Sequence, residues 1–260
     1  MKRRYEMPGE QPGFFRSVDL VPERIADRSV YPFDIPVLRS FTSLDLHPRV
    51  TYLVGENGSG KSTFLEAIAV AAGFNAEGGT KNFRFATRRS ESPLHGAIRL
   101  VRSHRRPRTG YFLRAESLFN VASEIEALDQ DPQGGPPIIG YYGGVSLHEQ
   151  SHGQSFLALL KNRFGPQGFY ILDEPEAALS PARQLSLLVS IHALVAQGSQ
   201  FIIATHAPIV LAYPDALIYE LDVDGSPPTP QAYEKTQTVQ TTASFLEDPT
   251  RWVSRLLADE

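Results

Sequence analysis

The stretch G-E-N-G-S-G-K-S-T, residues 55–63, decides how the chain is expected to fold. It fits the pattern G-x-x-x-x-G-K-[ST], in which glycines let the backbone turn sharply so that successive N–H groups point at one place. Lys61 and Ser62 complete the pattern. The glycines are Gly55, Gly58 and Gly60. Converging N–H donors with a lysine beside them suit phosphate oxygens, whereas the alternative is an ordinary glycine-rich turn before a helix.

The residues on both sides of this loop supply the strand and the helix that the pattern needs. V-T-Y-L-V (50–54) is predicted as a buried strand, and residues 61–72 as a helix that Gly73 ends. The partial positive charge of a helix N-terminus adds to an anion site. We therefore expect Lys61 to reach the β- and γ-phosphates of a nucleotide. Ser62 is expected to ligate Mg²⁺, and Thr63 to contact the α-phosphate. The expected nucleotide-binding residues of the loop are Gly55, Glu56, Asn57, Gly58, Ser59, Gly60, Lys61, Ser62 and Thr63.

Two further apolar runs end in residues that belong to the same chemistry. G-F-Y-I-L-D-E (168–174) is predicted as a strand ending in two carboxylates, and Q-F-I-I-A-T-H (200–206) as a strand ending in a histidine. Asp173 is expected to hold the metal, Glu174 to deprotonate the attacking water, and His206 to sense the γ-phosphate. With Lys61, Glu174 and His206 form the expected catalytic set. Taken alone, paired acids could cap a helix and a lone histidine could be a turn residue.

The segment between these two strands predicts a helix. Ser180 and Pro181 are a typical N-cap and first-turn pair, and Gly198 places the end of the helix near residue 197. A strand, a helix and a strand in that order predict a right-handed crossover with parallel pairing. The expected fold class is α/β, with a mostly parallel central sheet flanked by helices.

The bulk composition narrows the class of protein. At 260 residues, 42% hydrophobic and 21% charged, the chain has the size and composition of a soluble globular domain. No apolar run reaches the roughly 18 to 20 residues that a membrane helix needs, so no membrane insertion is expected. The absence of cysteine excludes disulfides and thiolate metal sites. We expect a cytoplasmic protein.

The motifs, in this order, resemble the ATP-binding-cassette (ABC) ATPases over nearly the whole chain. In that family a signature of the form L-S-G-G-Q opens a helix about twenty residues before the acidic strand. Q-S-H-G-Q (150–154) has that place here; Ser151, Gly153 and Gln154 match, whereas the first and third residues depart. The resemblance implies that Ser151 and the backbone at Gly153 bind the γ-phosphate of an ATP held by a second copy. It thus implies a homodimer with ATP and Mg²⁺ as cofactors, whereas the alternative is a capped helix start.

The same resemblance implies one P-loop domain of ABC type for residues 1–260. We expect a core lobe at about residues 14–73 and 168–222, a β-rich, basic arm lobe at about 74–120, a helical signature region at about 121–167, and a C-terminal tail at 223–260. The Gly- and Pro-rich residues 131–144 are predicted as a loop, and residues 245–257 as a short helix.

The sequence motif around Asp173 and Glu174 differs from that of transport subunits. These usually read D-E-P-T-S-A-L-D and T-H-D, whereas this chain reads D-E-P-E-A-A-L-S-P (173–181) and T-H-A-P (205–208). It is closer to the stand-alone predicted ATPases related to the RecF, SMC and OLD-type DNA-maintenance enzymes. The 90 residues from Lys61 to Ser151 are too few for a long coiled coil, so the resemblance is to a compact head.

Two positions of the family pattern are less well defined. G-Y-F-L-R-A-E (110–116) lacks the glutamine that follows this strand in transport subunits. Arg114 or Glu116 is expected to stand in for it, and Glu116 is an expected metal residue beside Ser62 and Asp173. Tyr31 and Phe33 are the candidates for stacking on adenine, although Y-P-F reads equally well as packing at a strand end.

One segment is strongly basic. Residues 81–114 contain ten Lys or Arg and one acid, Glu91, so the segment carries +9 and the rest of the chain −13 of the total of −4. The cations are Lys81, Arg84, Arg88, Arg89, Arg99, Arg102, Arg105, Arg106, Arg108 and Arg114. Such a segment suits nucleic-acid phosphates, which would make binding steeply dependent on salt. The alternative, equally weighted, is a solvated face balanced by the acidic remainder.

Three functions therefore remain open for an ATPase of this kind. It could act on DNA or RNA in repair or defence, it could energise a membrane transporter through a permease partner, or it could be a nucleotide-gated binding switch. An unidentified protein partner is compatible with each of them.

Overall fold

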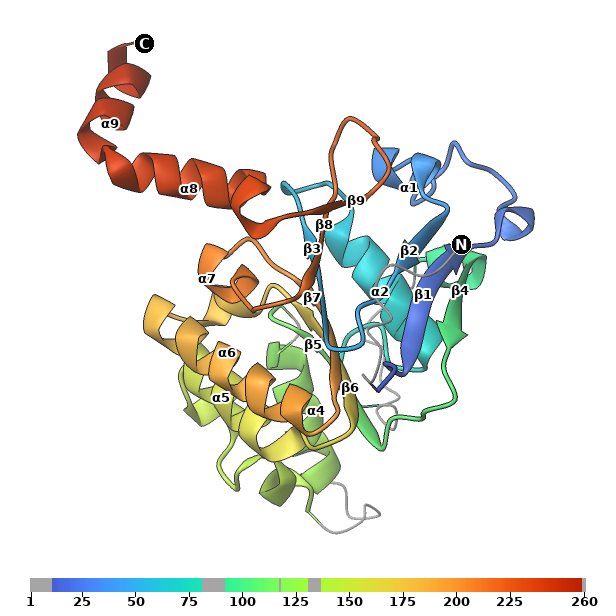
Figure 1. Cartoon of the computed structure of the whole chain (residues 1–260). Helices are drawn as coiled ribbons and strands as arrows, with labels where there is room; N and C mark the ends of the chain where they lie inside the picture. The colour runs from blue at the N-terminus through green and yellow to red at the C-terminus, as the bar shows by residue number, and fades with distance from the viewer. Residues whose placement is uncertain (1–10, 81–91, 117, 131–136, 259–260) are drawn as a thin grey trace.

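The computed structural model describes residues 11–80, 92–116, 118–130 and 137–258. Its centre is a six-stranded sheet in the order β5-β6-β7-β3-β8-β9 (Figure 1). The strands are β3 (Val50–Val54), β5 (Thr109–Arg114), β6 (Gly168–Asp173), β7 (Gln200–Ala204), β8 (Leu217–Glu220) and β9 (Thr229–Gln231). All neighbours pair in parallel except β8 and β9, which are antiparallel. The predicted α/β class with a mostly parallel sheet is confirmed.

The three central strands are hydrophobic runs because both faces of the sheet are covered. Every residue of β3, β6 and β7 is buried, as expected for parallel strands between two layers. The sheet therefore separates two apolar cores, one on each face.

A second, antiparallel sheet covers one face together with α2 (Lys61–Ala72). Its order is β2-β1-β4, with β1 (Phe15–Leu20) between β2 (Ser43–Asp45) and β4 (Ile98–Arg102). Phe64 and Leu65 of α2 are buried in the same core as Phe15 and Ile98. Figure 1 shows α2 beside these strands. Short helices complete this layer: η1 (Pro22–Arg24), α1 (Pro36–Ser40) and α3 (Leu94–Ala97).

The other face carries the remaining long helices. They are α4 (Leu118–Gln130), α5 (His152–Arg163) and α6 (Pro181–Ala196), with the short α7 (Pro208–Leu211) beside them (Figure 1). Phe156 and Leu159 of α5 and Ile191 of α6 are buried in one core with Tyr170 and Phe201 of the sheet. The single turns η2 (Ile139–Tyr142), η3 (Leu147–Glu149), η4 (Pro175–Ala178) and η5 (Tyr233–Lys235) connect these elements.

The predicted elements of the core agree closely with the structure. The strand at 50–54 and the helix at 61–72 have the predicted bounds, and Gly73 ends the helix with φ of 94°. The strands predicted at 168–174 and 200–206 are one and two residues shorter, because the chain leaves the sheet after Asp173 and Ala204. The helix α6 follows the N-cap Ser180 and ends at Ala196.

The segment predicted as a basic arm is divided between the two sheets. β4 pairs with β1 in the antiparallel sheet, whereas β5 pairs in parallel with β6 and is a strand of the central sheet. Residues 81–91, which carry four of the ten cations, lie outside the described part of the chain. Of the loop predicted at 131–144, residues 131–136 are also outside it, and Ile139–Tyr142 form a 3₁₀ turn.

The C-terminal tail forms two helices where one short helix was predicted. α8 (Gln237–Glu247) and α9 (Pro249–Ala258) are separated at Asp248, because a proline cannot continue a helix. Neither helix has a buried residue, and both project from the body of the molecule (Figure 1). We call these two helices, residues 237–258, the C-terminal arm.

Candidate functional site

The loop of residues 55–60 has a backbone that requires glycine at two tightly packed positions. Gly55 has φ of 146°, and a Cβ there would lie 2.3 Å from the carbonyl oxygen of Leu221. Gly60 has φ of 95°, and its Cβ would lie 2.9 Å from Ile35. Side chains are strongly disfavoured in such conformations. A side chain at either position would therefore disturb the conformation in which the loop enters α2.

Lys61 is the first residue of α2 and is only 4% exposed to solvent. Its Nζ donates hydrogen bonds to the carbonyl oxygens of Gly55 and Glu56, each at 2.9 Å. Burial lowers the pKa of Lys61, while the nearby carboxylates, Glu174 first among them, oppose this effect. The ammonium group is thus held inside the loop, where a phosphate would face it.

Ser62 and Asp173 bring two oxygen ligands together at the end of β6. Ser62 Oγ donates to Asp173 Oδ1 at 3.0 Å. Burial raises the pKa of Asp173 to about 6, although Arg114 and Ser62 lower it. Hard oxygen ligands of this kind are those that Mg²⁺ prefers, usually with phosphate oxygens and water completing its shell. Among the described residues no group of three or more His, Cys, Asp or Glu side chains could hold a metal ion.

Arg114 ends β5 and faces the same aspartate. Its Nη1 donates to Glu66 Oε2 at 2.8 Å, and its Nε lies 3.5 Å from Asp173 Oδ2. Glu116 follows in the turn after β5. A cleft of about 250 Å³ opens beside these groups. It is lined by Ser62, Arg114, Ala115, Glu116, Asp173, Glu174, Ala177 and Ala178. Both candidates for the missing glutamine therefore border the cleft, and Arg114 contacts Asp173.

Glu174 and His206 face each other at the ends of β6 and β7. Glu174 Oε1 lies 3.0 Å from His206 Nε2, and both side chains are 34% exposed. Glu174 has left-handed backbone angles, φ 50° and ψ 53°, which cost energy for a residue with a side chain. Its N–H donates to the carbonyl oxygen of Ala204 on the neighbouring strand. The strained turn thus directs the Glu174 carboxylate toward the histidine.

The main chain of His206 is held from two directions. Its N–H donates to Glu176 Oε1 at 2.5 Å, and its carbonyl oxygen accepts from Thr238 Oγ1 at 2.8 Å. Gln237, at the start of α8, donates from Nε2 to Glu56 Oε1 at 3.1 Å. Sequence reasoning did not predict a part for Glu176, Gln237 or Thr238. Only Glu176 left a signal, the unusual fourth letter of D-E-P-E.

Ser151 and Gln154 begin α5 as a reciprocal capping box. Ser151 N donates to Gln154 Oε1 at 3.0 Å, and Gln154 N donates to Ser151 Oγ at 3.4 Å. A Cβ at Gly153 would lie 2.7 Å from the carbonyl oxygen of Ala178 and 2.3 Å from Arg183. Ser151 is exposed and is not among the residues that line the cleft. The capped helix start, which was the alternative interpretation, is therefore present, and it brings the signature stretch against the turn after the acids.

The two candidate adenine-stacking residues lie in different surroundings. Phe33 is 9% exposed and is part of the hydrophobic core, so its ring is packed rather than presented to a ligand. Tyr31 is 62% exposed, and its hydroxyl lies 3.2 Å from Thr63 Oγ1. Of the two, Tyr31 alone has a ring that a base could reach, and it stands beside the phosphate loop.

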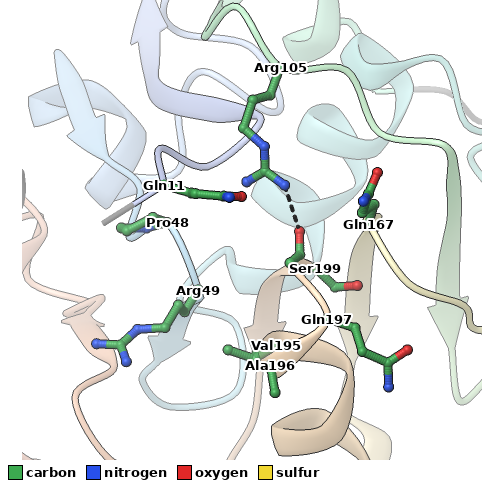
Figure 2. A pocket seen from close by; sticks show the side chains of 10 residues that line it. Gln11, Pro48, Arg49, Arg105, Gln167, Val195, Ala196, Gln197 and Ser199 are labelled. Carbon is green, nitrogen blue, oxygen red and sulfur yellow. Dashed lines mark hydrogen bonds between the residues drawn. The ribbon is translucent and has the colours of Figure 1, made fainter. Parts of the chain in front are cut away.

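A larger cavity of about 410 Å³ lies at the opposite, amino-terminal ends of the strands (Figure 2). Arg105 donates to the carbonyl oxygens of Pro12 and Gly198, at 2.7 and 3.1 Å, and stacks on Phe14. Its guanidinium therefore connects the segment before β1 to the turn before β7. The cavity lies at the end of the strands opposite to residues 55–63. Figure 2 shows Arg105 pointing across the cavity mouth toward the residues before β7.

The described cations of the basic segment are largely engaged within the protein. Arg99 pairs with Asp19 at 3.2 Å, and Arg114 pairs with Glu66. Arg102 lies over the Phe15 ring, and Arg106 donates to the carbonyl oxygen of Ser103 at 2.9 Å. Both residues, like Arg108, are nevertheless exposed on or beside the connection from β4 to β5. This distribution favours the interpretation of a solvated and structural charge run for most of the described cations.

Comparison with known proteins gives one family match and several similar solved structures. Residues 33–118 match the family model of an AAA domain, and no curated protein matches the chain. An SMC head domain from Thermotoga maritima is similar in structure, with a TM-score of 0.45 and 17% identity over 84% of this chain and 99% of that one. An ATP-binding cassette of an ABC transporter in its ADP conformation has a TM-score of 0.44 and 18% identity over 91% and 98%. An SMC head bound to the C-winged helix domain of ScpA has a TM-score of 0.46 and 14% identity over 86% and 99%.

The AAA-domain match, which includes the phosphate loop, agrees with the resemblance to ATPases that the motifs predicted. Within the described residues, no helix is both long and apolar enough to span a bilayer.

Proposed function

We propose that this protein is a Mg²⁺-dependent ATPase of ABC type that closes as a homodimer around two ATP molecules. One observation carries the proposal. The carboxyl ends of three parallel strands, β3, β6 and β7, bring the phosphate loop, the Asp173–Glu174 pair and His206 to one edge of the sheet. Ligands of open α/β sheets bind at this edge.

The binding half of the site consists of the loop and the start of α2. Lys61 is expected to move its Nζ from the carbonyl oxygens of Gly55 and Glu56 to the β- and γ-phosphate oxygens, which are stronger acceptors. The first N–H groups of α2 have no partner within the helix and can donate to the same phosphates. Ser62 and Asp173 would hold Mg²⁺, and the ion would supply charge neutralisation to the bound phosphates.

The reacting half consists of Glu174 and His206. Glu174 is placed to accept a proton from a water molecule as the oxygen of that water attacks the γ-phosphorus. The bond from that phosphorus to the bridging oxygen breaks, and ADP leaves with the electron pair of the broken bond. His206 Nε2, which lies 3.0 Å from Glu174 Oε1, can keep this carboxylate in place and donate to a γ-phosphate oxygen in the same region. No step requires a further reactant.

A second copy is proposed because one protomer leaves the signature stretch unused. Ser151 is exposed and does not line the cleft beside Ser62 and Asp173. The N-terminus of α5, like that of α2, is suited to an anion. Two protomers arranged head to tail would bring Ser151 and Gly153 of each to the terminal phosphate bound by the other. Donors supplied in trans can raise phosphoryl-transfer rates by about 10³ to 10⁵.

An ATPase assay across protein concentration tests this function. The rate per protomer is expected to rise with concentration, because dimerisation completes the site. Ser151→Ala should slow turnover while preserving the binding of ATP to the monomer. Ser186→Ala, which changes an exposed serine on α6, is the matched control. Absence of hydrolysis at every concentration would refute the ATPase, and a concentration-independent rate would refute the dimer.

Coupling to DNA or RNA is the second part of the proposal. It is supported by the exposed Arg102, Arg106 and Arg108 around the β4–β5 connection and by the resemblance of D-E-P-E-A-A-L-S-P to DNA-maintenance ATPases. Binding should weaken steeply with salt, with a slope set by the number of phosphates contacted. A titration of labelled single- and double-stranded DNA and of RNA against salt tests this. If no nucleic acid binds at low salt, the transporter and switch functions remain. Copurification with a permease would support the transporter, and a turnover that no partner stimulates would support the switch.

A further inference from the structure

The residue Glu176 has no part in the ATPase chemistry set out above, yet it contacts the candidate sensor directly. Its Oε1 accepts the N–H of His206 at 2.5 Å, a short contact between a carboxylate and a backbone donor. Bonds to an ionised acceptor are about twice as strong as neutral ones. The contact joins the turn after β6 to the turn after β7, two segments thirty residues apart in the chain.

The local backbone explains how a glutamate reaches that position. Glu174 takes left-handed angles, and Pro175 then begins the single 3₁₀ turn η4. This reversal brings Glu176 back toward the end of β7, where His206 begins the connection to α7. The turn is closed by bonds from Ala177 N to Glu174 O and from Leu179 N to Glu176 O. The backbone of Glu176, from which its side chain projects, is therefore held in place by the turn.

The contact acts on the main chain of the histidine, whereas its ring bonds to Glu174, which lines the cleft. The ring nitrogen Nε2 lies 3.0 Å from Glu174 Oε1, while the peptide groups on either side bond to Glu176 and Thr238. Neither Glu176 nor His206 is among the residues lining the cleft, whereas Glu174 is. Its second oxygen, Oε2, is buried without a hydrogen-bond partner within the described residues. Glu176 therefore reaches the cleft indirectly, through the His206 backbone and the contact of the His206 ring with Glu174.

We propose that Glu176 is a positioning residue: its carboxylate holds the backbone of His206 so that the imidazole stays against Glu174 and faces the terminal phosphate. The proposal rests on the ATPase function proposed above. Transport subunits carry threonine at this place of the motif, so the glutamate distinguishes this chain from them. A residue of this kind should govern turnover much more than nucleotide affinity.

Three variants separate the positioning role from a general effect on folding. Glu176→Ala removes the acceptor, and Glu176→Gln keeps an uncharged acceptor of the same shape. Glu176→Thr introduces the residue that transport subunits usually have at this position. The matched control is Glu234→Ala, an exposed glutamate in η5 away from the motif. Urea unfolding of each variant shows whether the fold is retained.

The first readout is the division between kcat and the Kd for ATP. Glu176→Ala should lower kcat about 10- to 100-fold, while the Kd changes by less than about threefold. Glu176→Gln should recover most of the lost turnover, and Glu176→Thr should resemble the alanine variant. Equal kcat in all variants, or equal losses for the alanine and glutamine variants, would overturn the proposal.

The second readout does not depend on hydrolysis. In a proton–nitrogen correlation spectrum the His206 amide should lie far downfield in the wild type, because its N–H bonds to a carboxylate. It should shift upfield and exchange faster with solvent in Glu176→Ala, partly so in Glu176→Gln, and not in Glu234→Ala. An unchanged His206 amide in Glu176→Ala would refute the positioning role. Absence of wild-type hydrolysis would instead refute the ATPase function, and the amide would still decide whether Glu176 holds His206.

Discussion

Arg114 Nε lies 3.5 Å from Asp173 Oδ2, so a guanidinium already faces the carboxylate that is expected to hold Mg²⁺. Arg114 is kept there by its 2.8 Å contact with Glu66. Ser62 bonds to the other oxygen of the same carboxylate. A permanent cation therefore lies beside the carboxylate that is expected to hold the metal, and it changes the electrostatics of this site.

Arg114→Gln should shift the pH dependence of metal binding. Arg114 lowers the pKa of Asp173, which burial raises to about 6. Without the cation the pKa should rise further, so the carboxylate would ionise at higher pH. We expect the midpoint of Mn²⁺ binding with ADP to move up by about one pH unit in an EPR titration. Arg108→Gln, an exposed arginine before β5, is the control. A midpoint that stays fixed or moves down would contradict this account.

Glu174→Gln should separate binding from hydrolysis. The amide is nearly isosteric with the carboxylate but cannot accept the proton of the attacking water. Turnover should fall by about 10² to 10⁴ with little change in ATP affinity, as expected for loss of a general base. The variant should accumulate as an ATP-bound dimer, which light scattering measures. Glu234→Gln should behave as wild type. A Glu174→Gln protein that stays monomeric at saturating ATP would count against the proposed dimer.

Gly153→Ala should destabilise the protein. Its Cβ would lie 2.7 Å from the Ala178 carbonyl oxygen, and the backbone at Ala178 would have to move. Overpacking of this kind costs about 1–3 kcal/mol in the free energy of unfolding, measurable by urea denaturation. Gly140→Ala is the matched control, because nothing lies within 4 Å of the added methyl group. Equal stability of the two variants would show that the signature stretch does not press on the turn after the acids.

Asp173→Asn should make the protein more stable near neutral pH. Burial raises the pKa of Asp173 from 3.8 to about 6, so the folded state binds a proton more tightly than the unfolded state. Stability is therefore lost as the pH rises from about 4 to 6, and the loss is complete above that range. Replacing the carboxylate should add about 1–3 kcal/mol to the free energy of unfolding at pH 7 and much less at pH 4.5. Urea unfolding at both pH values measures this. An equal gain in stability at both pH values would show that the pKa of Asp173 is not raised in the folded protein.

The elements around the phosphate loop were predictable because their signals are local. The loop needs glycines at fixed places, β3 is a continuous apolar run, and α2 begins and ends at clear residues, Lys61 and Gly73. The position of β5 was not predictable in the same way. Its partner β6 begins more than fifty residues later, so its membership of the central sheet depends on a long-range pairing. The division of the C-terminal arm into two helices could have been predicted from Pro249, which begins the second helix.

The site was predictable in its residue types and only partly in its contacts. Glu174 and His206 were expected at the ends of neighbouring strands, and their side chains meet. The roles assigned to them stay predictions. The contacts of Glu176 and Thr238 with the His206 backbone depend on the turn after β6 and on α8, which are distant from His206 in the sequence, and only the unusual Glu176 in D-E-P-E hinted at them. Phe33 shows the reverse, since an aromatic at the expected spacing is committed to the core.

The protein contains a single tryptophan, Trp252, and it lies in the C-terminal arm, where its Nε1 bonds to Ser244 across the junction of α8 and α9. Intrinsic emission excited at the red edge of tryptophan absorption therefore reports on this one place. A molecule that covers the arm should shift that emission to shorter wavelength, whereas one bound at the amino-terminal ends of the strands should leave it unaltered. The chain thus carries its own optical reporter for whatever docks on its last two helices, with no label added.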